Sequence, residues 1–401
     1  MTKVVIIGAG HAGGSAAAFL RQYGFTGAIV LAGQEAAPPY QRPPLSKAWL
    51  KGEADLDALL LRPESFYAEH RIDFRRSVTV VAVDAVSKSV TFADGGRETY
   101  DILILATGST ARKLPVSGGD DPELLELRTL RDAERLKAVL GPGKRLAVVG
   151  GGYVGLEAAA SARALGAEAV VIEREARVLA RVASQTLSDF FTARHRAEGV
   201  EILTGAEVRS VAANGVTLAD GGTVQADAVL VGVGAVACDA LAVSAGLACD
   251  NGVVVDAEAR TGNPSIFAIG DMTRRPIPAL GGVSWRLESV PNALEQAKQA
   301  AAAITGRPQP APEVPWFWSD QYDLKLQIAG LPLNADRQIV RGDPGTSSFA
   351  VFHLSGDRIV CVEAVNAPPE FMAGKQLIGK GAAVDRARLS NPGVSMKSVA
   401  A

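Results

Sequence analysis

Two glycine-rich turns of the same kind, each directly after an apolar run, constrain the fold of this chain most. Residues 8–13 read G-A-G-H-A-G and follow the run V-V-I-I, while residues 150–155 read G-G-G-Y-V-G and follow L-A-V-V. One G-x-G-x-x-G segment is a weak signal. Two of them, each leaving a buried strand and opening a helix, indicate two dinucleotide sites in one polypeptide. A protein that holds two dinucleotides typically passes electrons between them.

Each glycine of such a turn has a mechanical role. The first permits the tight turn, the second lets the backbone approach a pyrophosphate, and the third lets the helix pack onto the strand. The helix N-terminus then offers free N–H groups to the phosphates. We therefore expect the following residues to bind dinucleotides: Gly8, Gly10, His11, Ala12 and Gly13 in the first turn, and Gly150, Gly152, Tyr153, Val154 and Gly155 in the second.

A carboxylate about 20 residues after each turn should bind the ribose hydroxyls. In the second half this residue is Glu173, and in the first half it is Glu35. A carboxylate at this strand end favours NADH, because it repels the 2′-phosphate of NADPH. Arg174 and Arg177 weaken this inference, since an arginine can accept a phosphate.

The chain reads as two copies of one architecture followed by a third unit. Gly/Asp turns at residues 93–96 and 219–222 fall at comparable places in the two halves. We expect a discontinuous first domain (1–112 and 237–314), an inserted second domain (113–236) and a C-terminal domain (315–401). The Pro-rich segment 37–44 should lack regular structure, the first helix should span 15–23, and the tail from Asn391 should be loose.

Bulk properties exclude several function classes. The formal charge of −2 gives no reason to expect nucleic acid or an acidic membrane as partner. No run of eighteen apolar residues is present, and the N-terminus enters a strand without a signal peptide, so we expect a cytoplasmic protein. Cys238, Cys249 and Cys361 are too widely spaced for a local redox disulfide or a four-cysteine metal site, and we expect no metal.

Five further segments carry a resemblance to a known family. Residues 102–108 (I-L-I-L-A-T-G) and 265–271 (S-I-F-A-I-G-D) look like the flavin motifs of the glutathione-reductase-like superfamily. Within it, residues 40–47 (Y-Q-R-P-P-L-S-K), 286–293 (R-L-E-S-V-P-N-A) and 315–322 (P-W-F-W-S-D-Q-Y) resemble the NADH-dependent ferredoxin reductases of bacterial oxygenases, the putidaredoxin reductase and biphenyl dioxygenase reductase group. The matches extend from residue 4 to about residue 330.

The resemblance implies an α/β fold of the glutathione-reductase type. It consists of two Rossmann-like, three-layer ββα dinucleotide-binding domains and a C-terminal α+β domain. The first turn would bind FAD and the second NADH. The flavin residues carried over are Ala106, Thr107, Gly108, Asp271 at the ribityl chain, Val80 at the adenine through its backbone, and Arg42 and Arg128 at the phosphates or adenine. Either arginine could instead be an ordinary surface residue.

The resemblance also implies which residues face the reacting ring. Lys47 would lie near the flavin N5 and pair with Glu157, although a solvated lysine and a helix-dipole carboxylate are the plainer readings. Val290 stands where the family has Trp, which would alter packing over the flavin. Trp316 and Trp318 would form an aromatic wall near the flavin, although alternating aromatic residues are more often core.

The segment 34–49, where relatives carry reactive cysteines, contains no cysteine. Reduction through a thiol is therefore unavailable there, and electrons must leave directly from the flavin. We expect an NADH-dependent ferredoxin reductase that serves a 2Fe-2S ferredoxin feeding a haem monooxygenase or ring-hydroxylating dioxygenase, as a monomer or weak homodimer. A rubredoxin reductase and an NADH-sensing flavoprotein like the apoptosis-inducing-factor relatives are the alternatives.

Overall fold

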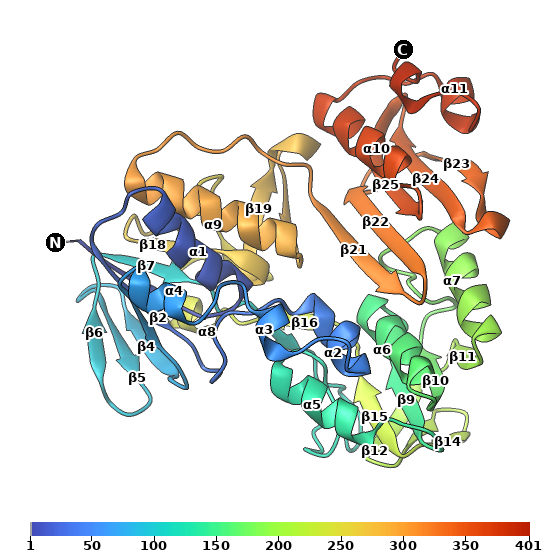
Figure 1. Cartoon of the computed structure of the whole chain (residues 1–401), viewed down its shortest axis with the longest axis horizontal. Coiled ribbons are helices and arrows are strands. Elements are labelled where there is room, and N and C mark those ends of the chain that lie inside the picture. The colour runs from blue at the N-terminus through green and yellow to red at the C-terminus, as the bar shows by residue number, and fades with distance from the viewer. Residues whose placement is uncertain (1) are drawn as a thin grey trace.

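The computed structural model describes residues 2–401 and contains three main sheets (Figure 1). The first is a five-stranded parallel sheet formed by two distant parts of the chain. Its order is β18 (Ile266–Ala268), β7 (Ile102–Leu105), β1 (Lys3–Ile7), β2 (Ala28–Ala32) and β3 (Ile72–Arg75). The return of the chain to add β18 makes the domain discontinuous.

Both faces of this sheet are covered, which explains why its strands are apolar without alternation. Val4 and Ile6 of β1 pack against α1 (His11–Gln22) and α9 (Val290–Thr305). Val5 and Ile7 face the opposite way, toward the antiparallel sheet of β4 (Val80–Asp84), β5 (Ser89–Phe92) and β6 (Arg97–Thr99). The result is a three-layer ββα domain.

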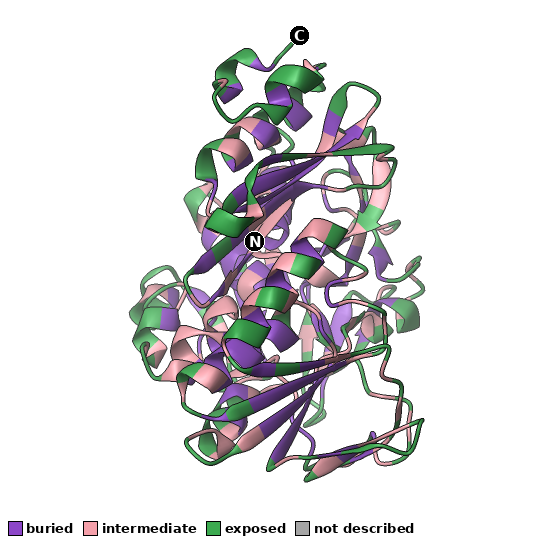
Figure 2. Cartoon of the chain, turned by 90° about the vertical axis from the view of Figure 1, so that its right-hand side faces the viewer, coloured by how far each residue is buried: buried purple, intermediate pink, exposed green. Residues whose placement is uncertain are grey.

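The second domain repeats this plan. Its parallel sheet has the order β11 (Val200–Thr204), β10 (Glu168–Glu173), β9 (Arg145–Val149) and β15 (Ala228–Val231). One face packs on α5 (Leu130–Val139), α6 (Tyr153–Ala164) and α7 (Gln185–Ala197), and the other packs on β12 (Val208–Ala212), β13 (Gly215–Leu218) and β14 (Thr223–Gln225). The strands of the parallel sheets are largely buried, in keeping with the many strand segments coloured as buried in Figure 2.

The chain crosses between these two domains on a pair of short antiparallel strands. β8 (Ser109–Ala111) leads out and β16 (Ala235–Ala237) leads back, paired residue by residue.

The third domain is an antiparallel sheet with helices on one face. Its order is β21 (Trp316–Gln321), β22 (Leu324–Gly330), β25 (Arg358–Val365), β24 (Ser348–Ser355) and β23 (Arg337–Asp343). α10 (Pro368–Lys380) and α11 (Arg386–Ser390) cover one face. Leu324, Leu326 and Ile328 project from the other face into the core of the second domain, which fixes the two domains together.

The remaining elements are short. They are the helices α2 (Ala48–Lys51), α3 (Leu56–Leu59), α4 (Ser65–Glu69) and α8 (Ala240–Ser244), the 3-10 turns η1 (Pro43–Ser46), η2 (Gly270–Met272), η3 (Pro278–Leu280), η4 (Pro344–Thr346) and η5 (Met396–Ser398), and a small sheet of β17 (Val253–Val254), β19 (Thr273–Ile277) and β20 (Val283–Arg286). Within residues 2–401, no helix combines the length and the apolar character needed to cross a bilayer.

Three local expectations were wrong. The first helix begins at His11 rather than residue 15, because it starts within the glycine turn itself. The Pro-rich segment enters a 3-10 turn at Pro43, since proline is well suited to the first position of a helical turn. The tail is not loose: Met396 and Val399 are buried, and Arg341 donates hydrogen bonds to the carbonyls of Asn391 and Val394.

Candidate active site

The two glycine turns have the geometry that dinucleotide binding requires. Gly8 and Gly150 adopt φ of 107° and 112°, and a Cβ on either would lie within 2.4 Å of a carbonyl oxygen, that of Ala106 or Gly232. A larger residue at these positions would force the strand and the following segment apart. The tight turn therefore needs glycine.

The other glycines of the turns separate into packing and open positions. A Cβ on Gly13 or Gly155 would lie 1.9 or 2.2 Å from the carbonyl oxygen that begins the same turn. A Cβ on Gly152 would meet no heavy atom within 4 Å, and one on Gly10 would meet only the Arg42 guanidinium at 3.9 Å. Neither helix has a side-chain N-cap, so both second positions leave room and free N–H groups for a phosphate.

A cavity of about 810 Å³ extends from the first turn to the start of α6 and the strand β21. This size is in the range of cofactor pockets. Most residues predicted for the flavin and the reaction line it, namely Gly8, Gly10, His11, Ala12, Glu35, Arg42, Lys47, Val80, Ala106, Thr107, Gly108, Arg128, Tyr153, Val154, Glu157, Asp271 and Val290. Gly13, Gly150, Gly152, Gly155, Glu173 and Trp316 are outside this lining.

Lys47 and Glu157 form a mostly buried ion pair at one end of the cavity. The Lys47 Nζ lies 2.6 Å from Glu157 Oε2 and also donates to the Pro43 carbonyl at 3.1 Å. Their side chains are 16% and 5% exposed, so neither is an ordinary surface charge. The Ser46 hydroxyl donates to the same Glu157 oxygen at 2.5 Å, and the Ser319 hydroxyl donates to Oε1 at 2.6 Å. The carboxylate is thus held by the end of η1, which supplies Ser46 and Lys47, and by β21, which supplies Ser319.

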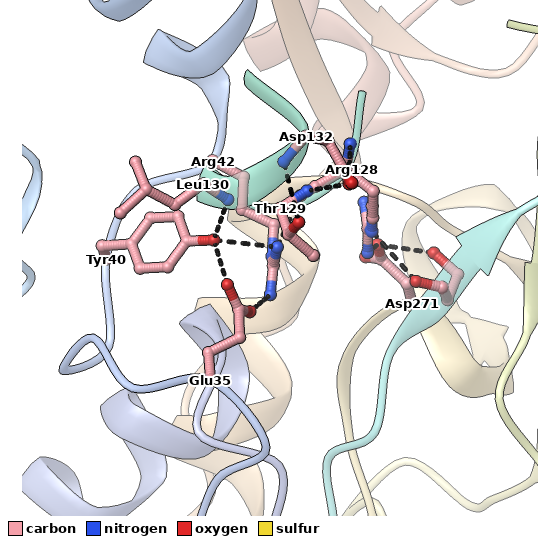
Figure 3. A network of polar contacts seen from close by, with 9 residues as sticks. Glu35, Tyr40, Arg42, Arg128, Thr129, Leu130, Asp132 and Asp271 are labelled. Carbon is pink, nitrogen blue, oxygen red and sulfur yellow. Dashed lines mark hydrogen bonds and ion pairs between the residues drawn. The ribbon is translucent and has the colours of Figure 1, made fainter. Parts of the chain in front are cut away.

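A second polar network joins the segment after β2 to the start of α5 (Figure 3). Glu35 accepts hydrogen bonds from Tyr40 and Arg42, both at 2.6 Å, and Arg42 donates to the Arg128 carbonyl at 2.5 Å. The Tyr40 hydroxyl in turn accepts from the Leu130 amide at 2.9 Å. Burial and the adjacent Glu35 raise the pKa of Tyr40, so its hydroxyl stays protonated and can donate. The network holds the Arg42 guanidinium close to Gly10, 3.9 Å from where a Cβ on Gly10 would lie.

Asp271 lies opposite this network, in η2 directly after β18. Its Oδ2 accepts from the Arg128 guanidinium at 2.8 Å and from Ser109 at 3.3 Å. Thr107 is held by a bond from its hydroxyl to the Cys238 carbonyl at 2.6 Å. Arg128 and Asp271 both line the cavity. Together they offer hydrogen-bond donors and a hydrogen-bond acceptor to a polar ligand.

His11 is the first residue of α1 and lines the cavity. Its Nδ1 is buried and has no hydrogen-bond partner. Burial lowers the pKa of His11 to about 4, against the opposing influence of Asp271. The ring is therefore neutral at pH 7.

We expect His11 to make the FAD-free chain sensitive to acid. Because the folded pKa lies near 4 and the unfolded value near 6.5, the unfolded chain binds the extra proton between these values, so protonation favours unfolding. Stability from this residue should fall by about 2 kcal/mol between pH 7 and pH 5. Urea unfolding of wild type and His11→Asn at both pH values measures it. Equal pH dependence in the two proteins would contradict the assignment.

The aromatic wall differs from the expectation. Trp318 and Phe317 line the cavity, whereas Trp316 does not. Trp316 packs against Phe371 with ring centroids 5.6 Å apart and joins the core of the C-terminal domain. Of the two tryptophans expected in the wall, Trp318 lines the cavity and Trp316 does not. Val290, at the first position of α9, does line the cavity and presents less apolar surface there than the Trp of the family.

Glu173 closes the second turn in a way that the sequence did not reveal. Its two carboxylate oxygens accept from the Gly151 amide at 2.7 Å and the Glu175 amide at 2.8 Å. The carboxylate therefore holds the backbone of the turn and of the segment after β10. Arg177 donates instead to Ala180, Ala183 and Ser188, which uses its guanidinium within the fold.

The sequence reasoning missed Tyr40, Ser46 and Ser319 as site residues. Tyr40 and Ser46 belong to the segment 40–47, and Ser319 to the segment 315–322, so each lay inside a motif already selected. Their roles depend on contacts with Glu35 and Glu157, more than 100 residues away in the case of the two serines. Spacing alone carries no signal for such contacts.

Comparison with known proteins agrees with this geometry. The family model "Pyridine nucleotide-disulphide oxidoreductase" matches residues 2–297, and "Reductase C-terminal" matches residues 316–400. A probable ferredoxin reductase CtmF of Castellaniella defragrans is 50% identical over 99% of this chain and 98% of its own length. The ferredoxin reductase subunit of 5,5'-dehydrodivanillate O-demethylase from Sphingobium sp. is 42% identical with the same coverage.

The solved structures show the same fold. A putidaredoxin reductase, determined in covalent complex with putidaredoxin, is 40% identical and superposes with a TM-score of 0.96 over 99% of this chain and 97% of its own. The glutathione-reductase-like fold expected from the sequence is thereby confirmed, as are FAD and NAD(H) as the cofactors. The chain belongs to the pyridine nucleotide-disulphide oxidoreductase family and carries the C-terminal domain of its ferredoxin reductase members.

Proposed function

We propose that this protein is an NADH-dependent ferredoxin reductase that passes electrons from NADH through FAD to a 2Fe-2S ferredoxin. That ferredoxin would supply a haem monooxygenase or a ring-hydroxylating dioxygenase. The most informative observation is the Lys47–Glu157 pair, which lies at the end of the cavity that the cysteine-free segment 34–49 helps to line. With no thiol in the segment 34–49, electrons must leave the flavin directly.

The remaining cysteines do not replace that missing thiol. Cys238 lines the cavity, but burial raises its pKa, which keeps it protonated and a poor nucleophile. Cys361 is fully buried in the C-terminal domain and Cys249 is outside the cavity lining. This supports direct transfer to a separate electron carrier.

The residues present fit FAD. The open Gly10 position and the free N-terminus of α1 suit a pyrophosphate. Asp271 can accept a hydrogen bond from a ribityl hydroxyl, and Arg42 and Arg128 can donate to phosphate or adenine. When bound, a flavin accepts two electrons together from NADH and releases them one at a time. Lys47 would hold positive charge beside the ring as negative charge develops there.

The domain assignment follows from the same arrangement. We propose that residues 1–112 and 237–314 bind FAD, that 113–236 bind NADH, and that 315–401 cover the reacting edge of the cavity. Tyr153, Val154 and Glu157 bring the start of α6 to the cavity, which would place the nicotinamide beside the flavin. We further propose a monomer or weak homodimer in the cytoplasm.

NADH rather than NADPH is favoured by the surroundings of Glu173. A 2′-phosphate would meet this carboxylate, and Arg177 is already used by backbone carbonyls. We expect Glu173→Ala to raise the KM for NADH about tenfold, the effect of one lost hydrogen bond to a charged group. Steady-state kinetics with NADH and NADPH measures the change, with Glu175→Ala, which removes a partly exposed carboxylate beside Arg174, as control. Unchanged NADH kinetics would remove Glu173 from the ribose site.

The test of the proposed function is cytochrome c reduction with purified carriers. We expect NADH to support rapid reduction only when a 2Fe-2S ferredoxin is added, and NADPH to support little. Reduction without any carrier, or a preference for NADPH, would contradict the proposal. Rubredoxin as the better acceptor would favour a rubredoxin reductase. Slow turnover with every carrier, together with an NADH-dependent change of oligomeric state, would favour an NADH-sensing flavoprotein.

A further inference from the structure

A line of polar side chains runs from Glu157 through an otherwise apolar interface to the surface of the second domain. Ser319 donates to Glu157 Oε1 at 2.6 Å, and Gln321 Nε2 donates to Ser319 at 3.1 Å. The Gln321 Oε1 lies 2.8 Å from His195 Nε2, and the Tyr322 hydroxyl lies 3.0 Å from His195 Nδ1. The flavin end of the cavity is thus connected to α7 and to the β21–β22 hairpin.

The side chains of Ser319, Gln321 and His195 in this line are buried, so they are not ordinary polar surface residues. Ser319 and Gln321 are each 1% exposed and His195 is fully buried. Ser319 and Gln321 alternate on β21 and so share one face, among apolar neighbours such as Leu156, Phe191 and Leu326. Burying amide, hydroxyl and imidazole groups costs free energy that apolar side chains at the same positions would avoid. A purely structural interface would not need them.

The chemistry of the groups gives the line one direction. The amide oxygen of Gln321 can only accept, so His195 must donate from Nε2. Burial lowers the pKa of His195 and keeps the ring neutral, so Nδ1 accepts from Tyr322. Gln321 then donates to Ser319, whose hydroxyl donates to the carboxylate. Every donor points toward Glu157, and hydrogen bonds aligned in this way strengthen one another.

The outer end of the line is fixed by charged and aromatic contacts. Tyr322 adopts a φ of 57° in the two-residue turn of the hairpin and packs edge-on against His195 with ring centroids 5.1 Å apart. Arg194 lies over the Tyr322 ring and pairs with Asp323 at 2.7 Å. These contacts hold the hairpin to α7 and so fix the C-terminal domain against the second domain.

We propose that Ser319, Gln321, His195 and Tyr322 are positioning residues that orient the Glu157 carboxylate and so hold Lys47 at the reacting end of the cavity. Ser319 occupies Oε1, which leaves Oε2 to Lys47 and Ser46. The C-terminal domain thus sets the geometry of a pair that belongs to the other two domains. This inference rests on the proposed reaction of NADH with the flavin.

The first experiment measures flavin reduction by NADH in the FAD-loaded protein under anaerobic stopped flow. We expect Ser319→Ala to lower the limiting rate constant about tenfold, while the Kd for NADH is unchanged, because one hydrogen bond to the charged group is lost. Ser319→Thr keeps the hydroxyl and should restore the rate. Ser89→Ala is the matched control, since Ser89 is a buried serine of β5 whose hydroxyl pairs with that of Ser87, outside the line.

The second experiment determines the direction of the hydrogen bonds in the line and does not depend on enzyme activity. The chain has four histidines, so nitrogen NMR of labelled imidazoles resolves each one, with assignment from His11→Asn, His70→Asn and His353→Asn. We expect His195 to be neutral, with the proton on Nε2. A proton on Nδ1, or a wild-type rate in Ser319→Ala, would overturn the inference. If NADH did not reduce the flavin of the wild-type protein, the proposed function would be overturned instead. The NMR result would still test the direction of the hydrogen bonds in the line.

Discussion

Replacing Lys47 by Met should slow the reduction of the flavin by NADH by about 100-fold, with little change in NADH affinity. The ammonium group is mostly buried, faces the cavity and is held 2.6 Å from Glu157, so its charge is already in place when negative charge develops nearby. Loss of one preorganised charge or donor of this kind costs about 10²–10³ in rate. Anaerobic stopped-flow absorbance of the flavin gives the rate constant, and its dependence on NADH concentration gives the affinity.

Lys47→Met should also lower the stability of the protein, and a second substitution can distinguish this loss from the loss of rate. Lys47→Met leaves a buried carboxylate with only Ser46 and Ser319 as donors, and breaking such a pair costs about 3 kcal/mol. The double variant Lys47→Met/Glu157→Gln removes both charges and should recover most of that stability while remaining slow. A double variant that regains the rate would show that Lys47 acts only by neutralising Glu157. A single variant within twofold of wild type would remove Lys47 from the reaction.

The parts of the fold that the sequence predicted are those decided by local chemistry. The Gly8 and Gly150 turns need a positive φ, and the covered parallel sheets need apolar strands, so both are written in consecutive residues. The matched turns at Asp94 and Asp220 illustrate the repeat: in each, the carboxylate accepts from the glycine two residues later at 2.8 Å. A local signal of this kind survives in any tertiary context.

The missed features depend on contacts between distant segments. The tail from Asn391 is rich in small polar residues, yet Arg341 of β23 satisfies its carbonyls and so orders it. Alternation placed Trp316 and Trp318 on the same face of β21, but it could not tell which of them reaches the cavity and which packs on α10. The serines at Glu157 were missed for the same reason, because their partner comes from another domain.

Replacing Asp271 by Ala should weaken FAD binding about 10- to 100-fold, which corresponds to the loss of one charge-assisted hydrogen bond. Asp271 faces the cavity beside Arg128, 2.8 Å from its guanidinium, and its carboxylate is the acceptor that we assign to the ribityl chain. The variant would also leave Arg128 without its ionic partner. Fluorescence titration of the FAD-free protein with FAD gives the Kd, and Asp271→Asn, which keeps one acceptor oxygen, should lose less.

Lys47→Met and Asp271→Ala should lose different properties. The difference tests whether one part of the cavity binds FAD and another part takes part in the reaction. Lys47→Met should keep its FAD and react slowly, because Lys47 acts where the electrons move. Asp271→Ala should lose FAD, yet the fraction that retains it should be reduced by NADH at close to the wild-type rate. Asp250→Ala, which removes an exposed carboxylate paired with Arg274, is the control for charge alone. An Asp271→Ala protein with wild-type FAD affinity but slow reduction would place Asp271 at the reacting ring rather than at the ribityl chain.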